Sequence, residues 1–190
     1  MLKIFCVMLM TFSFAYSCAL CGNNKASFVN VSLTPSLSDG KIQKIHVNWK
    51  FDSATSKDFK TLYSEHIVES DKKRMYDALE RLQIPYFMTS ILINGKNTSF
   101  KAENFTLFFE NQLVSIAFDI PLDYKLNDKN NVEIIFVDST KAIVFLEDLD
   151  QTHIINTTEY NVQKSNGFKV IKEIMAAVNY IKLDISKWIL

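Results

Sequence analysis

Two cysteines, Cys18 and Cys21, lie three positions apart in the stretch YSCALCGNNK, directly after an apolar run. Two thiolates at this spacing can chelate one metal ion, and a free α-amino group on Cys18 would add a nitrogen ligand. This soft, mixed ligand set suits nickel, copper(I) or zinc. Because the set is still incomplete, a further ligand would come from a histidine, a partner or a second copy. His46 is the histidine best placed by sequence, on the polar face of an expected strand.

The same pair of cysteines allows other interpretations, including no role at all. A disulfide between Cys18 and Cys21 is allowed in an exported chain, but it would close a very short loop and stabilise little. The segment AYSC, residues 15–18, is an imperfect lipobox, and acylation of Cys18 would occupy both its sulfur and its amine. A lipid anchor and a full chelate therefore exclude each other. A thioredoxin-like role needs the motif at a helix start within a βαβ unit, which the following strands do not supply.

Residues 1–17 have the pattern of a secretory signal peptide. A short basic start (MLK) precedes an apolar run over residues 4–15, and small residues stand before the cleavage site. The run is too short to cross a bilayer as a helix, for which about 20 residues are needed. Cleavage after Ser17 would leave residues 18–25 as a mobile N-terminus that carries the two cysteines of the mature chain.

The composition indicates one exported globular domain. The chain has 190 residues, 48% of them hydrophobic, with 15 Phe, enough to build one sizeable core. Only four Gly and three Pro argue against a linker. The formal net charge of zero removes any general case for nucleic acid as a partner. No apolar run after the leader is long enough to span a membrane, so we expect a soluble or membrane-anchored periplasmic protein.

After Lys25 the hydrophobic period is mostly two, which is typical of strands with one buried face. Apolar residues alternate with polar ones over 29–33 and 45–51, on either side of the turn signal Ser38-Asp39-Gly40. Further strands of this kind are expected at 87–93, 105–109, 114–120, 132–137 and 142–146. We therefore predict a mostly β (α+β) fold, an antiparallel two-sheet β-sandwich over residues 26–163.

Two regions break the period of two. Apolar residues recur at helical spacing between positions 54 and 83, which predicts a helical insertion of two helices between strands. Over residues 164–190 the residues Ile174, Val178, Ile181 and Trp188 follow the spacing of an amphipathic helix. This C-terminal helix would pack on the sandwich or bind a membrane surface or a partner through the same stripe.

Several of these elements, in this order, resemble domain-of-unknown-function family 1007. The matching stretches are WKFD from Trp49, YFMTSILINGK with its turn, the hairpin FTLFFENQLVSIAFDIPL, and VEIIFVDSTKAIVFLEDLD, and the similarity runs from about Phe28 to about Leu149. The family consists of small exported bacterial proteins that are often encoded beside nickel/cobalt permeases or fused to them. The resemblance implies an accessory role in transition-metal transport, an inner-membrane nickel/cobalt permease as partner, and Trp49, Asp52 and Asp138 as family-matched positions.

The departures from the family concern its metal ligands. Members usually begin the mature chain with a His-Pro-His segment, whereas this chain has Asn24-Lys25-Ala26. Many relatives also carry a calcium-like acidic loop in the helical insertion, and residues 69–73 here have too few oxygen ligands for calcium. Cys18 and Cys21 are then candidate replacements for the missing histidines.

The sequence carries no recognised catalytic motif: we find no Gly-rich phosphate loop, no His-Glu-x-x-His helix and no nucleophile elbow. The carboxylate of Asp52 fits either a ligand or, as we prefer, the cap of a turn or helix. We therefore expect a non-enzymatic accessory protein that captures or passes nickel, cobalt, copper or zinc near a permease. The alternative is an envelope interaction module, with or without a lipid anchor at Cys18, that binds a membrane partner through the C-terminal helix.

Overall fold

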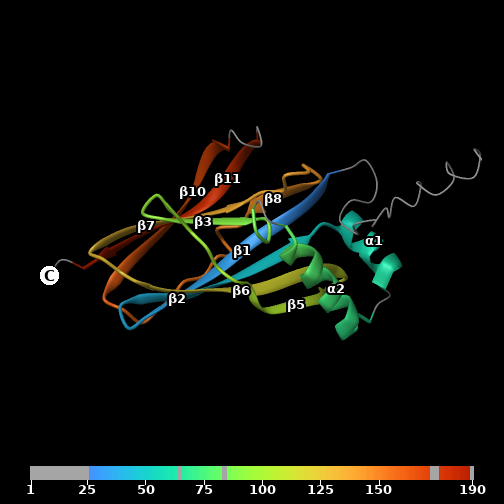
Figure 1. Cartoon of the computed structure of the whole chain (residues 1–190), viewed down its shortest axis with the longest axis horizontal. Helices are drawn as coiled ribbons and strands as arrows, with labels where there is room; N and C mark the ends of the chain where they lie inside the picture. Colours follow the sequence, from blue (N-terminus) through green and yellow to red (C-terminus); the bar gives the residue numbers. More distant parts are fainter. Residues whose placement is uncertain (1–25, 64–65, 83–84, 172–175, 189–190) are drawn as a thin grey trace, which may run out of the picture.

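The computed structural model describes residues 26–63, 66–82, 85–171 and 176–188. These residues form a mostly β protein with two sheets and two helices, as the sequence predicts (Figure 1). The first sheet has the order β5 (Glu103–Glu110), β6 (Leu113–Lys125), β2 (Lys41–Phe51), β1 (Ser27–Ser38) and β8 (Ile143–Glu147), with β9 (Ile155–Asn156) also paired to β1. The second has the order β10 (Tyr160–Ile171), β11 (Ala176–Lys187), β7 (Lys129–Phe136), β3 (Thr89–Ile93) and β4 (Lys96–Thr98).

The helical insertion lies where it was predicted. It consists of α1 (Ser53–Tyr63) and α2 (Glu69–Glu80), which lie at one end of the first sheet (Figure 1). Phe59 of α1 and Met75 and Leu79 of α2 are buried, so each helix contributes one apolar face to the core. Within the described residues, no helix is long and apolar enough to cross a membrane.

The predicted turns form three hairpins with two-residue loops. The loop residues are Asp39 and Gly40, Asn94 and Gly95, and Asn111 and Gln112, and all six have positive φ. Positive φ at both loop positions matches the right-handed twist of the flanking strands, which explains why Gly and Asn occupy most of these sites. On either side of the first loop, in β1 and β2, the side chains alternate between the core and the outside.

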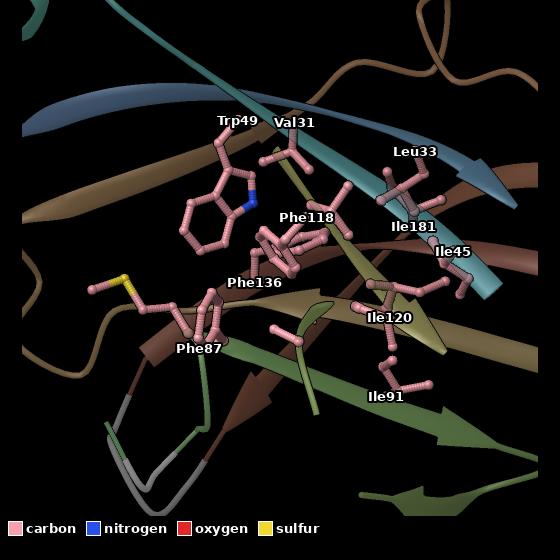
Figure 2. Packing of buried hydrophobic residues seen from close by; sticks show 14 of the residues in the cluster. Val31, Leu33, Ile45, Trp49, Phe87, Ile91, Phe118, Ile120, Phe136 and Ile181 are labelled. Carbon is pink, nitrogen blue, oxygen red and sulfur yellow. The ribbon is translucent and has the colours of Figure 1, made fainter. Parts of the chain in front are cut away.

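The two sheets face each other across one aromatic-rich core (Figure 2). Trp49 of β2 lies 5.2 Å from Phe118 of its own sheet and 6.2 Å from Phe136 of the other, both edge to face. Phe118 in turn lies 5.1 Å from Phe87, just before β3. Such contacts join the layers, so removing one large ring would loosen both sheets.

The prediction of a purely antiparallel fold is wrong at one edge. β1 pairs with β8 and with β9 in parallel. The cause is the path of the chain, which leaves the second sheet after β7 and enters the first sheet beside β1. A strand that arrives from the opposite sheet is not bound to the antiparallel direction that a tight hairpin imposes.

The predicted C-terminal helix is also wrong. Residues 164–190 include most of an antiparallel hairpin of β10 and β11, and the expected boundary at residue 163 falls inside β10. Ile181, Leu183 and Ile185 are all buried, which is the period of two of a strand. The helical prediction missed this period because it did not take Leu183 into account. β11 pairs with β10 on one side and β7 on the other, so tertiary pairing decided an ambiguous apolar pattern.

Gly167 of β10 is required by a close approach. The ring of Tyr180 on β11 lies over it, and a Cβ added to Gly167 would stand 2.0 Å from the ring atom Cζ. Gly167 is therefore the place where β10 leaves space for an aromatic side chain of the neighbouring strand.

Candidate functional site

His46 lies on the outer face of the first sheet and joins a cluster around Asp119. The His46 Nδ1 atom is 2.7 Å from Asp119 Oδ1, while Lys44 Nζ and Asn104 Nδ2 donate to Oδ2 at 2.8 and 2.9 Å. A carboxylate on Nδ1 orients the imidazole and directs Nε2 as the ring atom that can take a metal ion or a proton. His46 as a metal ligand stays a prediction.

Asp119 is buried although it points away from the core, and sequence analysis did not single it out. Burial raises its pKa, but the hydrogen bonds from Lys44, Asn104 and His46 outweigh this and lower the pKa to about 2. The sequence signal was one acidic residue within the apolar run VSIAFDIPL. Its partners come from β2 and from β5, so only the pairing of three strands brings the cluster together.

We expect Asp119→Asn to lower the free energy of unfolding by about 2 kcal/mol at pH 7, because a buried charged acceptor of three hydrogen bonds is lost. The folded pKa of about 2 lies below the ordinary value of 3.8, so the stabilisation is complete above the ordinary value and is lost as the pH falls through 2. Urea unfolding at pH 7 and at pH 2 measures the difference.

The matched control is Asp123→Asn, since Asp123 holds Lys41 at 2.8 Å on the same sheet but its side chain is 72% exposed. This variant should lose less than about 1 kcal/mol at either pH. An equal loss at both pH values for Asp119→Asn would show that the ionised carboxylate is not what stabilises the cluster.

The two family-matched acids, Asp52 and Asp138, have their oxygens occupied by backbone donors. Asp52 accepts hydrogen bonds from the N–H groups of Phe28 at 2.7 Å and Thr55 at 2.8 Å, which places it at the start of α1. Burial raises the pKa of Asp52, but these bonds outweigh it and lower the pKa. Trp49, the third such position, is buried in the core.

Asp138 organises the connection between the two sheets. Its carboxylate accepts hydrogen bonds from the N–H groups of Thr140, Ala142 and Ile143 at 2.8 to 2.9 Å, and from the Thr140 hydroxyl. These donors come from the turn that leads from β7 to β8. The acid therefore fixes the point at which the chain crosses from one sheet to the other.

The predicted partner-binding stripe does not form. Ile181 is fully buried in the core, Val178 is half-buried, and Trp188 is 62% exposed after the end of β11. A stripe that needs all of them on one helical face is therefore excluded. Ile174, like Cys18 and Cys21, lies outside the described residues.

A groove of about 800 Å³ opens on the outer face of the second sheet, beside the last residues of β10. Its apolar lining includes Tyr86, Leu92, Phe100, Ile135, Val137 and Ile171. Lys169 stands at its edge, with Nζ paired to Glu133 and 4.9 Å from the centre of the Tyr180 ring. The volume is in the range of ligand-binding clefts, and the lining suits apolar contact.

In the part of the chain that the structure describes, no three His, Cys, Asp or Glu side chains gather as ligands of one metal ion. The cysteine pair, outside this part, stays a prediction.

No known family model matches the chain, and a search of curated proteins finds no relative. The resemblance to domain-of-unknown-function family 1007 therefore stays a prediction, and what is established is a mostly β, two-sheet protein with two helices.

Proposed function

We propose that the protein is an exported, non-enzymatic interaction module of the cell envelope, a β-sandwich that binds a partner through its C-terminal hairpin. The observation that carries the proposal is the exposure of two large apolar side chains on β10, Phe168 at 65% and Val170 at 62%. Both lie on the last strand of the second sheet.

Exposed apolar residues on an edge strand are a liability, because they invite association with other chains. Exposed apolar side chains that stand alone are common and need no explanation. Contiguous ones, such as these two on one face of an edge strand, are the kind that mark interaction sites. The hairpin also borders the groove beside Tyr86, so an apolar partner would find contact on both of its faces. A partner that covers Phe168 and Val170 would bury the apolar surface that these two side chains expose.

The proposal is tested by placing a photo-crosslinking amino acid at Phe168 in the full chain, expressed in its own host. We expect one adduct of defined mass in the envelope fraction, reduced about tenfold by Val170→Lys in the same chain. The matched control is the same amino acid at Leu62, which is 59% exposed on α1. No adduct at Phe168, or the same adducts at Leu62, would exclude the hairpin as the binding surface.

A second candidate is the accessory role in transition-metal transport, favoured by the stretch Cys18-Ala19-Leu20-Cys21 after the leader and by the family resemblance. In this role the N-terminus captures or passes nickel, cobalt, copper or zinc near an inner-membrane permease, and His46 supplies a further ligand. Intact native mass spectrometry of the protein from its host, prepared without chelator, tests this role. An unacylated chain that starts at Cys18 and carries one of these ions supports it, and a lipidated Cys18 excludes the chelate.

A further inference from the structure

Strand β8 is an edge strand with one side of its backbone open. It pairs with β1 in parallel, and the ladder begins and ends with the bonds Ser27 N–H to Ala142 O and Asp148 N–H to Val31 O, both 2.8 Å. In a parallel ladder, alternate residues bond to the same neighbour. The peptide groups of the residues between, 143, 145 and 147, therefore point to the other side. Within the described residues no strand pairs with β8 there.

Carboxylates occupy the two ends of this open edge. The Ile143 N–H donates to Asp138 at 2.9 Å, and at the other end the carboxylate of Glu147 lies beside the Asn179 side chain of β11. Phe145, between them, keeps its N–H and C=O at the open edge. Among the described residues, the centre of β8 is therefore a place at which another strand can exchange both bonds with it.

A cavity of about 380 Å³ follows the same edge. Four successive residues of β8, 143 to 146, line it, so side chains from both faces of the strand border it. Ala177, Val178 and Asn179 of β11 line it as well. The cavity thus follows the backbone edge of β8, between the two sheets.

The second sheet continues past this edge as an apolar shelf, formed by Phe168 and Val170 of β10. These residues pair directly with Asn179 and Ala177 of β11, on the face that Ile181 turns to the core. They face the side of the first sheet but remain largely exposed. Because β10 is the last strand of its sheet, the shelf is one strand wide.

We propose that one extended segment of a partner polypeptide adds to β8 as a strand and covers the shelf of Phe168 and Val170. This inference rests on the proposed interaction function and names the kind of partner. An extended peptide supplies both the C=O and the N–H that Phe145 requires, and its alternate side chains would rest on the shelf.

Charge indicates the ends of the bound segment. Exposed Lys141 lies before β8, while Glu147 and Asp148 lie at its end. An antiparallel segment with a basic N-terminal end and an acidic C-terminal end would match both charges.

The probe is the peptide Lys-Val-Thr-Val-Thr-Val-Glu, acetylated and amidated, added to the full chain. Hydrogen exchange of the Phe145 amide, followed by NMR, should slow at least tenfold when the peptide is saturating. Two control peptides carry N-methyl groups on all the valines or on both threonines. Alternate amides of an added strand face β8, so one of the two controls should lose binding and the other should keep it.

Matched variants of the protein complete the test. Phe168→Lys together with Val170→Lys should abolish the protection, whereas Leu62→Lys on α1 should leave it unchanged; all three residues are exposed, so each variant should fold. Binding without slower exchange at Phe145, or equal binding by the double variant, would overturn strand addition.

Three further results would overturn part or all of the proposal. A Phe145 amide already protected without peptide indicates a second copy if the protection depends on protein concentration, and another segment of the same chain if it does not. If crosslinking at Phe168 succeeds while the peptide fails, the hairpin binds its partner without adding a strand. If crosslinking also fails, the interaction function itself is wrong.

Discussion

Ending the chain after Gly167 is expected to abolish the cooperative unfolding transition. The deletion removes β11, which lies between β10 and β7, together with the buried side chains of Ile181, Leu183 and Ile185. Burial of each such side chain contributes about 1.5–3 kcal/mol. Three of them account for much of a typical stability of about 5–15 kcal/mol.

Far-UV circular dichroism and a urea titration of the shortened chain measure this effect. The control is a chain that ends after Lys187, which keeps all of β11 and should retain its transition. If the chain ending at Gly167 still unfolded cooperatively, its C-terminal residues would be an appendage, as a helix packed on a finished sandwich would be. Because the shortened chain is expected not to fold, a loss of binding by it would say nothing about the partner-binding surface.

Trp49→Ala should lower the free energy of unfolding by about 3–5 kcal/mol, the usual cost of removing a large buried ring. Trp49 is 1% exposed, and its ring contacts Phe118, Phe136 and Phe145, so both sheets would border the resulting cavity. Urea unfolding measures the loss.

The chain supplies its own control, because Trp188 is the second of its two tryptophans and is 62% exposed. Trp188→Ala should change stability by less than about 0.5 kcal/mol. Because Trp49 is buried, we also expect the remaining fluorescence of this variant to be blue-shifted. A comparable loss from both substitutions would contradict the position of Trp49 at the centre of the core.

The sequence predicted those elements whose signal is local. The hairpin of β1 and β2 follows from strict alternation on either side of Asp39-Gly40, and the insertion of α1 and α2 follows from helical spacing. The C-terminal region failed because residues 174, 178, 181 and 185 fit a helix as well as 181, 183 and 185 fit a strand. The strand is selected over the helix because β11 pairs with the edge of β7, and that edge exists only once the whole sheet has formed.

The cluster around Asp119 shows the same limit. The position of His46 on the polar face of β2 could be predicted from alternation alone. Its partner Asp119 lies 73 positions further along the chain, and the register of β2 against β6 brings them together. No local pattern specifies that register. The sequence therefore indicated His46 as a candidate residue but could not identify Asp119 as its partner.

The parallel pairing of β1 has a consequence for the order of folding. The N–H of Leu33 in β1 donates to the hydroxyl of Thr152, 119 positions away along the chain. Contacts of such high sequence separation slow folding, since the loop between them must close before the contacts form. The edge of β1 that faces β8 and β9 can therefore complete its contacts only after most of the chain is present, whereas its hairpin with β2 needs only local residues.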